Sequence, residues 1–134
     1  MHVFSWLTLI VLLGAGCKSR STAATKEAIL WHRVGSWSGH GNLQTGSFTV
    51  ETGSLRLLWE ARNAPGADGG AFKVALHSSI SGRPLQVVID RKGPGRDATY
   101  IEDEPRVSFF VVESADLDWT LTLEEAVPAT VNKR

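Results

Sequence analysis

The sequence predicts an all-β domain, an antiparallel β-sandwich of about seven or eight short strands that is jelly-roll-like in a broad sense. Apolar residues recur at every second position along most of the chain after its first 27 residues. Clusters of Gly and Pro interrupt these runs at short intervals, which is typical of turns between strands. No segment supplies the crossover helix that a parallel sheet needs.

The expected strands are short runs that offer one apolar face to a core, because successive side chains of a strand point to opposite faces. In chain order they rest on Phe48 and Val50; Leu55, Leu57 and Trp59; Phe72, Val74 and Leu76; Leu85, Val87 and Ile89; Tyr100 and Ile101; Val107, Phe109 and Val111; and Trp119, Leu121 and Leu123. Residues 28–34 fit either a first strand or the end of a short helix.

Some of these runs carry a more specific prediction. Phe110 and Val112 interleave with the apolar residues of the run from 107 to 111, which indicates a central strand covered on both faces. Trp59 and Trp119 are in phase with apolar neighbours and are expected in the core. The closing pattern, 107–123, is similar to the last two strands of small extracellular sandwich domains appended to secreted bacterial proteins.

An uncharged apolar run extends from Val3 to Gly16. It is shorter than the roughly 20 residues that a membrane-spanning helix needs, and it fits the apolar region of about 7–15 residues in a signal peptide. We therefore expect residues 1–16 to be a signal peptide that sends the chain out of the cytoplasm.

The run ends in Leu13-Gly14-Ala15-Gly16-Cys17, which resembles the lipobox of bacterial lipoproteins. The resemblance implies a diacylglyceryl group on the Cys17 sulfur, cleavage before Cys17, and a protein held in the cell envelope by a lipid anchor, at the inner or the outer membrane. Gly14 departs from the family pattern, which usually has an aliphatic residue there, and only His2 stands where the family has a basic region. The alternative is an uncleaved anchor in which Cys17 is an incidental small residue.

Small, polar and basic residues follow the lipobox-like segment from 18 to 26. They predict a flexible tether, so that residues 17–26 join the anchor to one β-sandwich domain over 27–134. The chain has a single Cys, which rules out an intramolecular disulfide. Its 14 basic and 14 acidic residues balance, so no concentrated basic face is expected for nucleic acid.

The sequence shows no set of residues arranged for catalysis, and we expect no enzyme. The stretch Gly35-Ser36-Trp37-Ser38-Gly39 has the glycine spacing of a nucleophile elbow, but Trp stands where the Ser is needed, and a bend between strands is the interpretation. Gly93-Pro94-Gly95 reads as a hairpin turn, because Pro94 lacks an amide donor for phosphate. A hydrolase that depends on His40 or Asp103 remains the last alternative.

Three residues are candidates for ligand binding: Trp37 and His40, which lie among glycines, and Tyr100. Flat aromatic rings stack on sugar rings, so an exposed set would indicate saccharide recognition, although packing in the core is the competing interpretation for every Trp. Two acidic turns are candidates for calcium, because Ca²⁺ binds several carboxylate and carbonyl oxygens. They contain Glu102, Asp103 and Glu104, and Asp116 and Asp118. Solvated turns are the simpler interpretation, because neither cluster has the residue order of a self-sufficient calcium loop.

Together these features predict a lipid-anchored envelope protein whose β-sandwich is a binding or structural module. The expected partners are the membrane, through the anchor, and an envelope polysaccharide or protein. The alternative is a module that binds glycan or calcium specifically.

Overall fold

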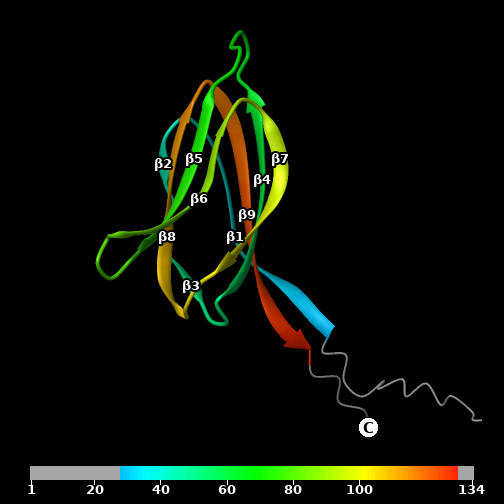
Figure 1. Ribbon diagram of the computed structural model, residues 1–134, viewed down its shortest axis with the longest axis vertical. Helices are drawn as coiled ribbons and strands as arrows, with labels where there is room; N and C mark the ends of the chain where they lie inside the picture. The colour runs from blue at the N-terminus through cyan, green and yellow to red at the C-terminus, as the bar shows by residue number, and fades with distance from the viewer. Residues whose placement is uncertain (1–27, 130–134) are drawn as a thin grey trace, which may run out of the picture.

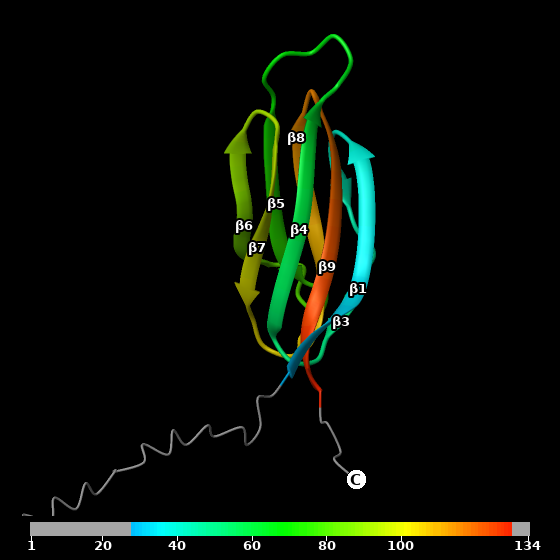
Figure 2. The same ribbon diagram turned by 90° about the vertical axis from the view of Figure 1, so that its right-hand side faces the viewer.

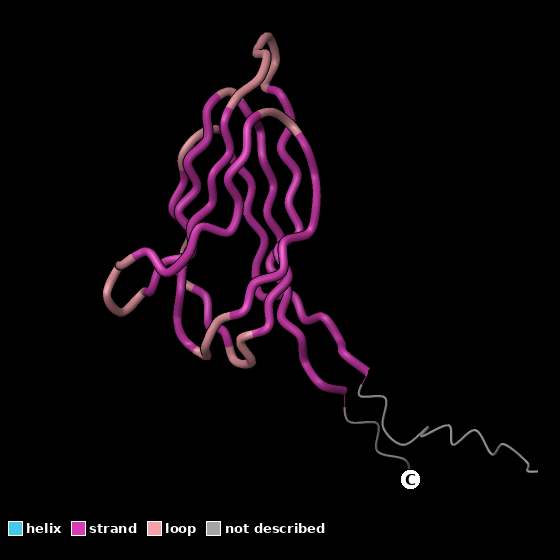
Figure 3. Tube along the Cα trace, viewed as in Figure 1, coloured by secondary structure: helices cyan, strands magenta, loops and turns pink. Residues whose placement is uncertain are grey.

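The computed structural model describes residues 28–129, which form a β-sandwich (Figures 1 and 3). The described chain contains strands and no helix. The strands are β1 (Ala28–His40), β2 (Leu43–Gln44), β3 (Phe48–Val50), β4 (Ser54–Asn63), β5 (Ala71–Ser78), β6 (Pro84–Lys92), β7 (Gly95–Glu102), β8 (Arg106–Ala115) and β9 (Leu117–Ala129). The predicted signal peptide, Cys17 and the tether lie outside the described residues. Nowhere in 28–129 is there a helix that could cross a bilayer.

Two antiparallel sheets form the layers. Sheet A has the strand order β1-β9-β4-β7, and Figure 2 faces it. Sheet B has the order β2-β8-β5-β6, and β3 pairs with the first part of β8. Because β2 and β3 both pair with β8, they share one strand position, and two layers of four positions result. This is the arrangement of a jelly roll, which has eight strands in two Greek keys, so the predicted fold class is confirmed.

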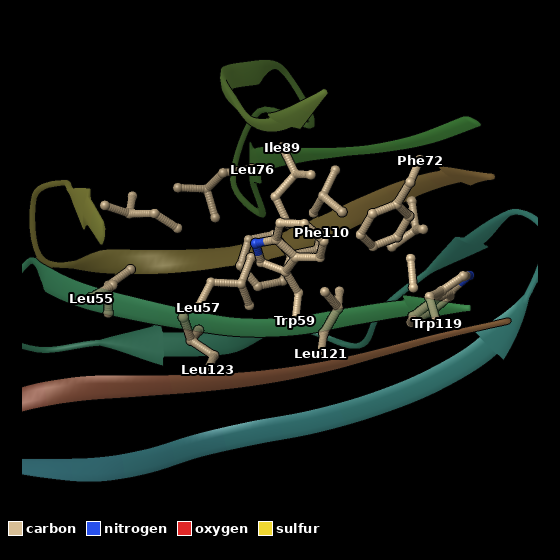
Figure 4. Close-up of a cluster of buried hydrophobic side chains, with 14 of the residues drawn as sticks. Leu55, Leu57, Trp59, Phe72, Leu76, Ile89, Phe110, Trp119, Leu121 and Leu123 are labelled. Carbon is tan, nitrogen blue, oxygen red and sulfur yellow. The ribbon is translucent and has the colours of Figure 1, made fainter. Parts of the chain in front are cut away.

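Side chains from the inner faces of both sheets meet in one core (Figure 4). Strand β4 alternates regularly between buried and half-buried positions, as period-two patterning predicts. Leu57 and Leu121 are fully buried, and Trp119 is 2% exposed and Trp59 7% exposed, which confirms that both Trp belong to the core. The core therefore supports the outer faces of both layers.

Strand β1 corrects one expectation. Residues 28–34 are strand, as one of the two interpretations held, but the strand continues through Gly35-Ser36-Trp37-Ser38-Gly39 to His40, where a bend was expected. The glycines have a packing role: a Cβ on Gly35 would lie 2.7 Å from the Trp37 ring, and a Cβ on Gly39 would lie 2.7 Å from the Trp119 ring. Glycine makes room for an indole at both places.

A β-bulge in β1 changes which face its side chains occupy. The pairing of β1 with β9 shifts between Arg33 and Gly35. Side chains of a strand alternate between its two faces, so one extra residue exchanges the inward and outward positions beyond the bulge. Consequently Trp31 lies on the outer face of sheet A and Trp37 on the inner face, although both have odd numbers.

The turn at Gly93-Pro94 also differs from the prediction. The chain does turn there, and Gly93 has a φ of 78°, a left-handed conformation that suits glycine. The flanking strands β6 and β7 belong to different sheets, however, so the turn carries the chain from one layer to the other rather than closing a hairpin.

Strand β8 is central, as predicted, since it lies between β5 and the pair β2 and β3. Its inner residues, Phe110 and Val112, are buried. The expected cover on its outer face is not found among the described residues: Val107 is 37% exposed and Phe109 is half-buried. The outer face of sheet B thus has an apolar strip along β8.

Candidate functional site

The outer face of sheet A combines aromatic, hydroxyl and charged side chains. The strand register aligns them in rows across the sheet, one residue from each strand. One row contains Ser36, Thr122, Leu58 and Ala98, and the next contains Ser38, Thr120, Glu60 and Arg96. Half of these eight side chains therefore carry hydroxyl groups, and all four hydroxyl residues lie on β1 and β9.

Two of these hydroxyl residues, Thr120 and Thr122, line a depression on this face. It has a volume of about 500 Å³, is open on its outer side, and is lined by Leu58, Trp59, Glu60, Arg96, Asp97, Thr120 and Thr122. Hydroxyl groups both donate and accept hydrogen bonds, whereas the carboxylate of Glu60 accepts and the guanidinium of Arg96 donates. The depression is suited to a neutral ligand with many hydroxyl groups.

An aromatic clamp borders the depression on the side of the chain ends. The guanidinium of Arg56 lies 4.2 Å from the centre of the Trp31 ring. The Trp31 and Tyr100 rings are 6.1 Å apart and inclined at 59°. Arg56 donates a hydrogen bond to Glu124 beneath them, and this bond raises the pKa of Arg56 above its ordinary value. We call Trp31, Arg56, Tyr100 and Glu124 the clamp.

The clamp holds the aromatic rings in place without burying them. Its four residues come from all four strands of sheet A, and Arg56 and Glu124 are hydrogen-bonded although 68 residues separate them in the chain. Tyr100 is still 66% exposed. Held in this way, its ring offers a flat surface to a ligand at low entropic cost.

His40 and Asp118 lie at the other end of the same face. The Nδ1 atom of His40 is 2.7 Å from Oδ1 of Asp118, and both side chains are largely exposed. A nucleophilic mechanism would need a Ser, Thr or Cys beside this pair. Within residues 28–129 the only side-chain hydrogen bond of His40 is the one with Asp118.

Trp37 does not belong to this face. It points inward from β1 and lies against Phe48 and Phe110, with ring centres 5.5 Å and 5.8 Å away. It is half-buried, and the Gly35 position beside it leaves space for the indole. Packing, the competing interpretation for every Trp, applies to Trp37. The candidate site therefore contains Tyr100 and His40 but not Trp37.

The two acidic turns lie at opposite ends of the sandwich. Glu102 pairs with Ser54 at the start of β4, whereas Leu117, between Asp116 and Asp118, pairs with Asn63 at its end. Nine residue steps along β4 separate them by about 30 Å. In 28–129 no group of three or more His, Cys, Asp or Glu side chains is placed to hold a metal ion.

Each turn has a structural role of its own. Arg106 forms ion pairs with Asp103 and Glu104, each at 3.2 Å. Asp116 adopts a φ of 60° in the tight turn between β8 and β9, and its carbonyl accepts a hydrogen bond from the Ala64 amide. These contacts join the two turns to the rest of the fold.

The chain matches no protein-family model, no curated protein and no solved structure. The candidate site is therefore argued from its own geometry.

Of the four clamp residues, the sequence singled out only Tyr100 as a candidate. Trp31 has no regular apolar pattern around it, and the bulge that turns it outward leaves no mark in the sequence except the glycines after it. Arg56 and Glu124 look like ordinary polar positions of two alternating strands. A signal was present in the alternation itself, since both residues occupy the outward positions of strands whose inward residues are buried.

Proposed function

We propose that this protein is a lipid-anchored module of the cell envelope that binds saccharide on the outer face of sheet A. The lipobox-like segment ending at Cys17 supports the anchor. One observation carries the binding role: an exposed, clamped Tyr100 lies beside a depression lined with hydroxyl and charged groups. Sugars have apolar C–H faces and many hydroxyl groups, and this surface offers partners to both.

The position of the face suits an anchored receptor. The described chain begins at Ala28 and ends at Ala129, which pair with each other at one end of the sandwich. The loop between β4 and β5 projects from the opposite end (Figure 1). An anchor joined to Ala28 by a short tether leaves the outer face of sheet A open to the side, where a polymer strand can lie across it.

Replacing the exposed ring tests the binding role. Tyr100→Ala removes the platform, and we expect the affinity for envelope polysaccharide to fall at least about tenfold, as truncation of an aromatic anchor in a binding site does. Affinity electrophoresis in gels that contain the polysaccharide measures the change. Phe109→Ala is the matched control, because Phe109 is an aromatic residue on the outer face of sheet B. Equal retention of both variants and the unchanged protein would contradict the saccharide proposal.

The anchor has a separate test. Metabolic labelling with palmitate marks the full chain if Cys17 is acylated, and Cys17→Ser abolishes the label. Labelling that persists in Cys17→Ser, or that is absent from the unchanged chain, would disprove the anchor. Neither result would affect the saccharide measurement, which concerns the folded domain.

A specific observation supports a second role, protein binding by sheet B. Its outer face leaves Val87 53% exposed and Val107 37% exposed, and Phe109 is half-buried. Exposed apolar patches of this kind commonly mark protein contacts. Chemical crosslinking through Val107→Cys in the envelope, compared with Ser38→Cys on sheet A, tests this role.

A further inference from the structure

Strands β1 and β9 run past the end of the sandwich and pair only with each other there. The pairing of β9 with β4 begins at Glu125, so the last residues of β9 have no neighbour on that side. Residues 28–31 and 126–129 form a two-stranded ribbon that projects from the body (Figures 1 and 3). We call these residues the terminal ribbon.

The terminal ribbon is apolar and exposed. Its sequence is Ala-Ile-Leu-Trp on β1 and Ala-Val-Pro-Ala on β9, without a single charged residue. Ile29 is 62% exposed and Leu30 is 58% exposed, and they point to opposite faces of the ribbon. Isolated exposed apolar residues are ordinary, but a projecting element that is apolar on both faces is not.

Charged residues follow the ribbon at once on both strands. His32 and Arg33 come next on β1, where both are exposed, and they pair with Glu125 and Glu124 on β9. Glu125 is buried, and Glu124 is bonded to Arg56. Trp31 lies at the boundary, where its ring contacts the Arg56 guanidinium. The end of the molecule therefore has an apolar tip, with Trp31 at its boundary and the exposed Arg33 and the Arg56–Glu124 pair next to it.

We propose that the terminal ribbon inserts into the interfacial region of a lipid bilayer. Four residue pairs of a strand span about 10 Å, which matches the depth of about 5–10 Å at which interfacial elements lie. Trp at the boundary is typical of the membrane–water interface. The outer edges of a two-stranded ribbon carry unpaired backbone amides and carbonyls, which hydrocarbon does not satisfy, so the ribbon stops at the interface.

The short stretch of chain between the predicted anchor and the terminal ribbon favours a lipid bilayer as the binding partner of the ribbon. Residues 18–27 separate Cys17 from the ribbon and reach at most about 35 Å when extended. The inference takes this proximity from the proposed function. With the ribbon in the interface, the loop between β4 and β5 points away from the membrane, and the outer face of sheet A stands upright beside it.

The test uses the chain that begins at residue 18. It lacks the predicted signal peptide and Cys17, and it keeps every residue of the core, all of which lie between Phe48 and Leu123. Binding to phosphatidylcholine vesicles is measured by flotation, because a zwitterionic surface gives the basic tether residues little to bind. Ile29→Ser with Leu30→Ser removes the apolar tip without adding charge.

We expect the double variant to lose at least about tenfold in vesicle partition, since two exposed aliphatic side chains no longer enter the interface. The control is Ile80→Ser with Leu43→Ser, which removes side chains that are 88% and 39% exposed elsewhere on the molecule. This control is expected to partition like the unchanged chain. Equal loss in both double variants, or no partition of the unchanged chain, overturns the proposal.

A second measurement keeps the proposal testable if the double variant fails to fold. Brominated lipids quench Trp fluorescence at the depth of the ring, and we expect Trp31→Phe to remove most of the quenching. Quenching that survives Trp31→Phe overturns the proposal. So does a ribbon that forms dimers in solution, since its edges would then pair with a second copy. Failure here with palmitate labelling and saccharide binding intact would refute the ribbon alone.

Discussion

The outer faces of the two sheets rest on one core but present different chemistry. Sheet A carries hydroxyl and charged residues around a depression, with a clamped Tyr100 at its border. Sheet B carries an apolar strip along β8, where Val107 is 37% exposed, and the His77 ring lies 5.2 Å from Phe109. A solvated sheet face normally alternates apolar-in with polar-out, and β8 departs from that rule because Val107, Phe109 and Val111 occupy its outward positions. The proposed function assigns saccharide binding to the polar outer face of sheet A and protein binding to the apolar strip of sheet B.

The largest expected change in stability comes from truncating a residue of the core on which both sheets pack. Leu121 is fully buried between the sheets. Leu121→Ala should lower the free energy of unfolding by about 2–5 kcal/mol, because it deletes buried methyl groups and leaves a cavity. Urea denaturation followed by Trp fluorescence measures the loss.

The control for this change is Val107→Ala, on the outer face of sheet B. It should cost less than about 1 kcal/mol, within the range of strand preferences at exposed sites. A loss as large as that of Leu121→Ala would mean that another part of the molecule covers the outer face of sheet B, and the contrast between the faces would fail.

A smaller change in stability distinguishes the inward from the outward positions of β1. In β1, Gly39 faces inward against Trp119, and Ser38 faces outward. Gly39→Ala places a methyl group 2.7 Å from a ring that is 2% exposed, and should cost about 1–3 kcal/mol by overpacking. Ser38→Ala should change stability by less than about 0.5 kcal/mol. Thermal unfolding of the two variants compares them, and equal shifts would contradict the assigned phase of β1.

The face that each side chain of β1 occupies also shows which features of the structure the sequence predicts and which it does not. The strands of the core follow from alternation, since Leu55, Leu57 and their counterparts must face inward to be buried. Trp31 and Trp37 are six residues apart, and strict alternation places them on the same face. The bulge between Arg33 and Gly35 separates them, and its position depends on the pairing with β9, which a local pattern does not contain.

The candidate site depends on the same long-range pairing. Tyr100 was recognised from the sequence as a candidate, but its neighbours Arg56 and Glu124 come from strands that meet only in the finished fold. Turns were easier to predict than their partners: Gly93 and Pro94 mark a turn, yet nothing local says that the next strand joins the other sheet. The sequence therefore predicts the strands and the core residues, whereas the pairing of the strands determines which side chains meet on the outer faces.

The smallest expected effect concerns the clamp, for which sheet B has no equivalent. Arg56→Lys keeps the positive charge but loses the planar group that stacks on Trp31 and bonds to Glu124. We expect the fold to be kept and Trp31 to loosen, so that acrylamide quenches fluorescence more strongly than in the unchanged protein. Arg83→Lys, in the exposed turn before β6, is the matched control and should leave quenching unchanged.

The pH dependence of the same measurement sharpens the test. Because the hydrogen bond to Glu124 raises the pKa of Arg56, the stabilisation from its charged form is fully present below the ordinary Arg value and is lost only at higher, strongly alkaline pH. Quenching of the unchanged protein should therefore be the same at about pH 6 and pH 9, both far below the Arg range. A clamp that opens between these values would show that a group other than Arg56 controls it, and the aromatic border of sheet A would then be a switch instead of a fixed platform.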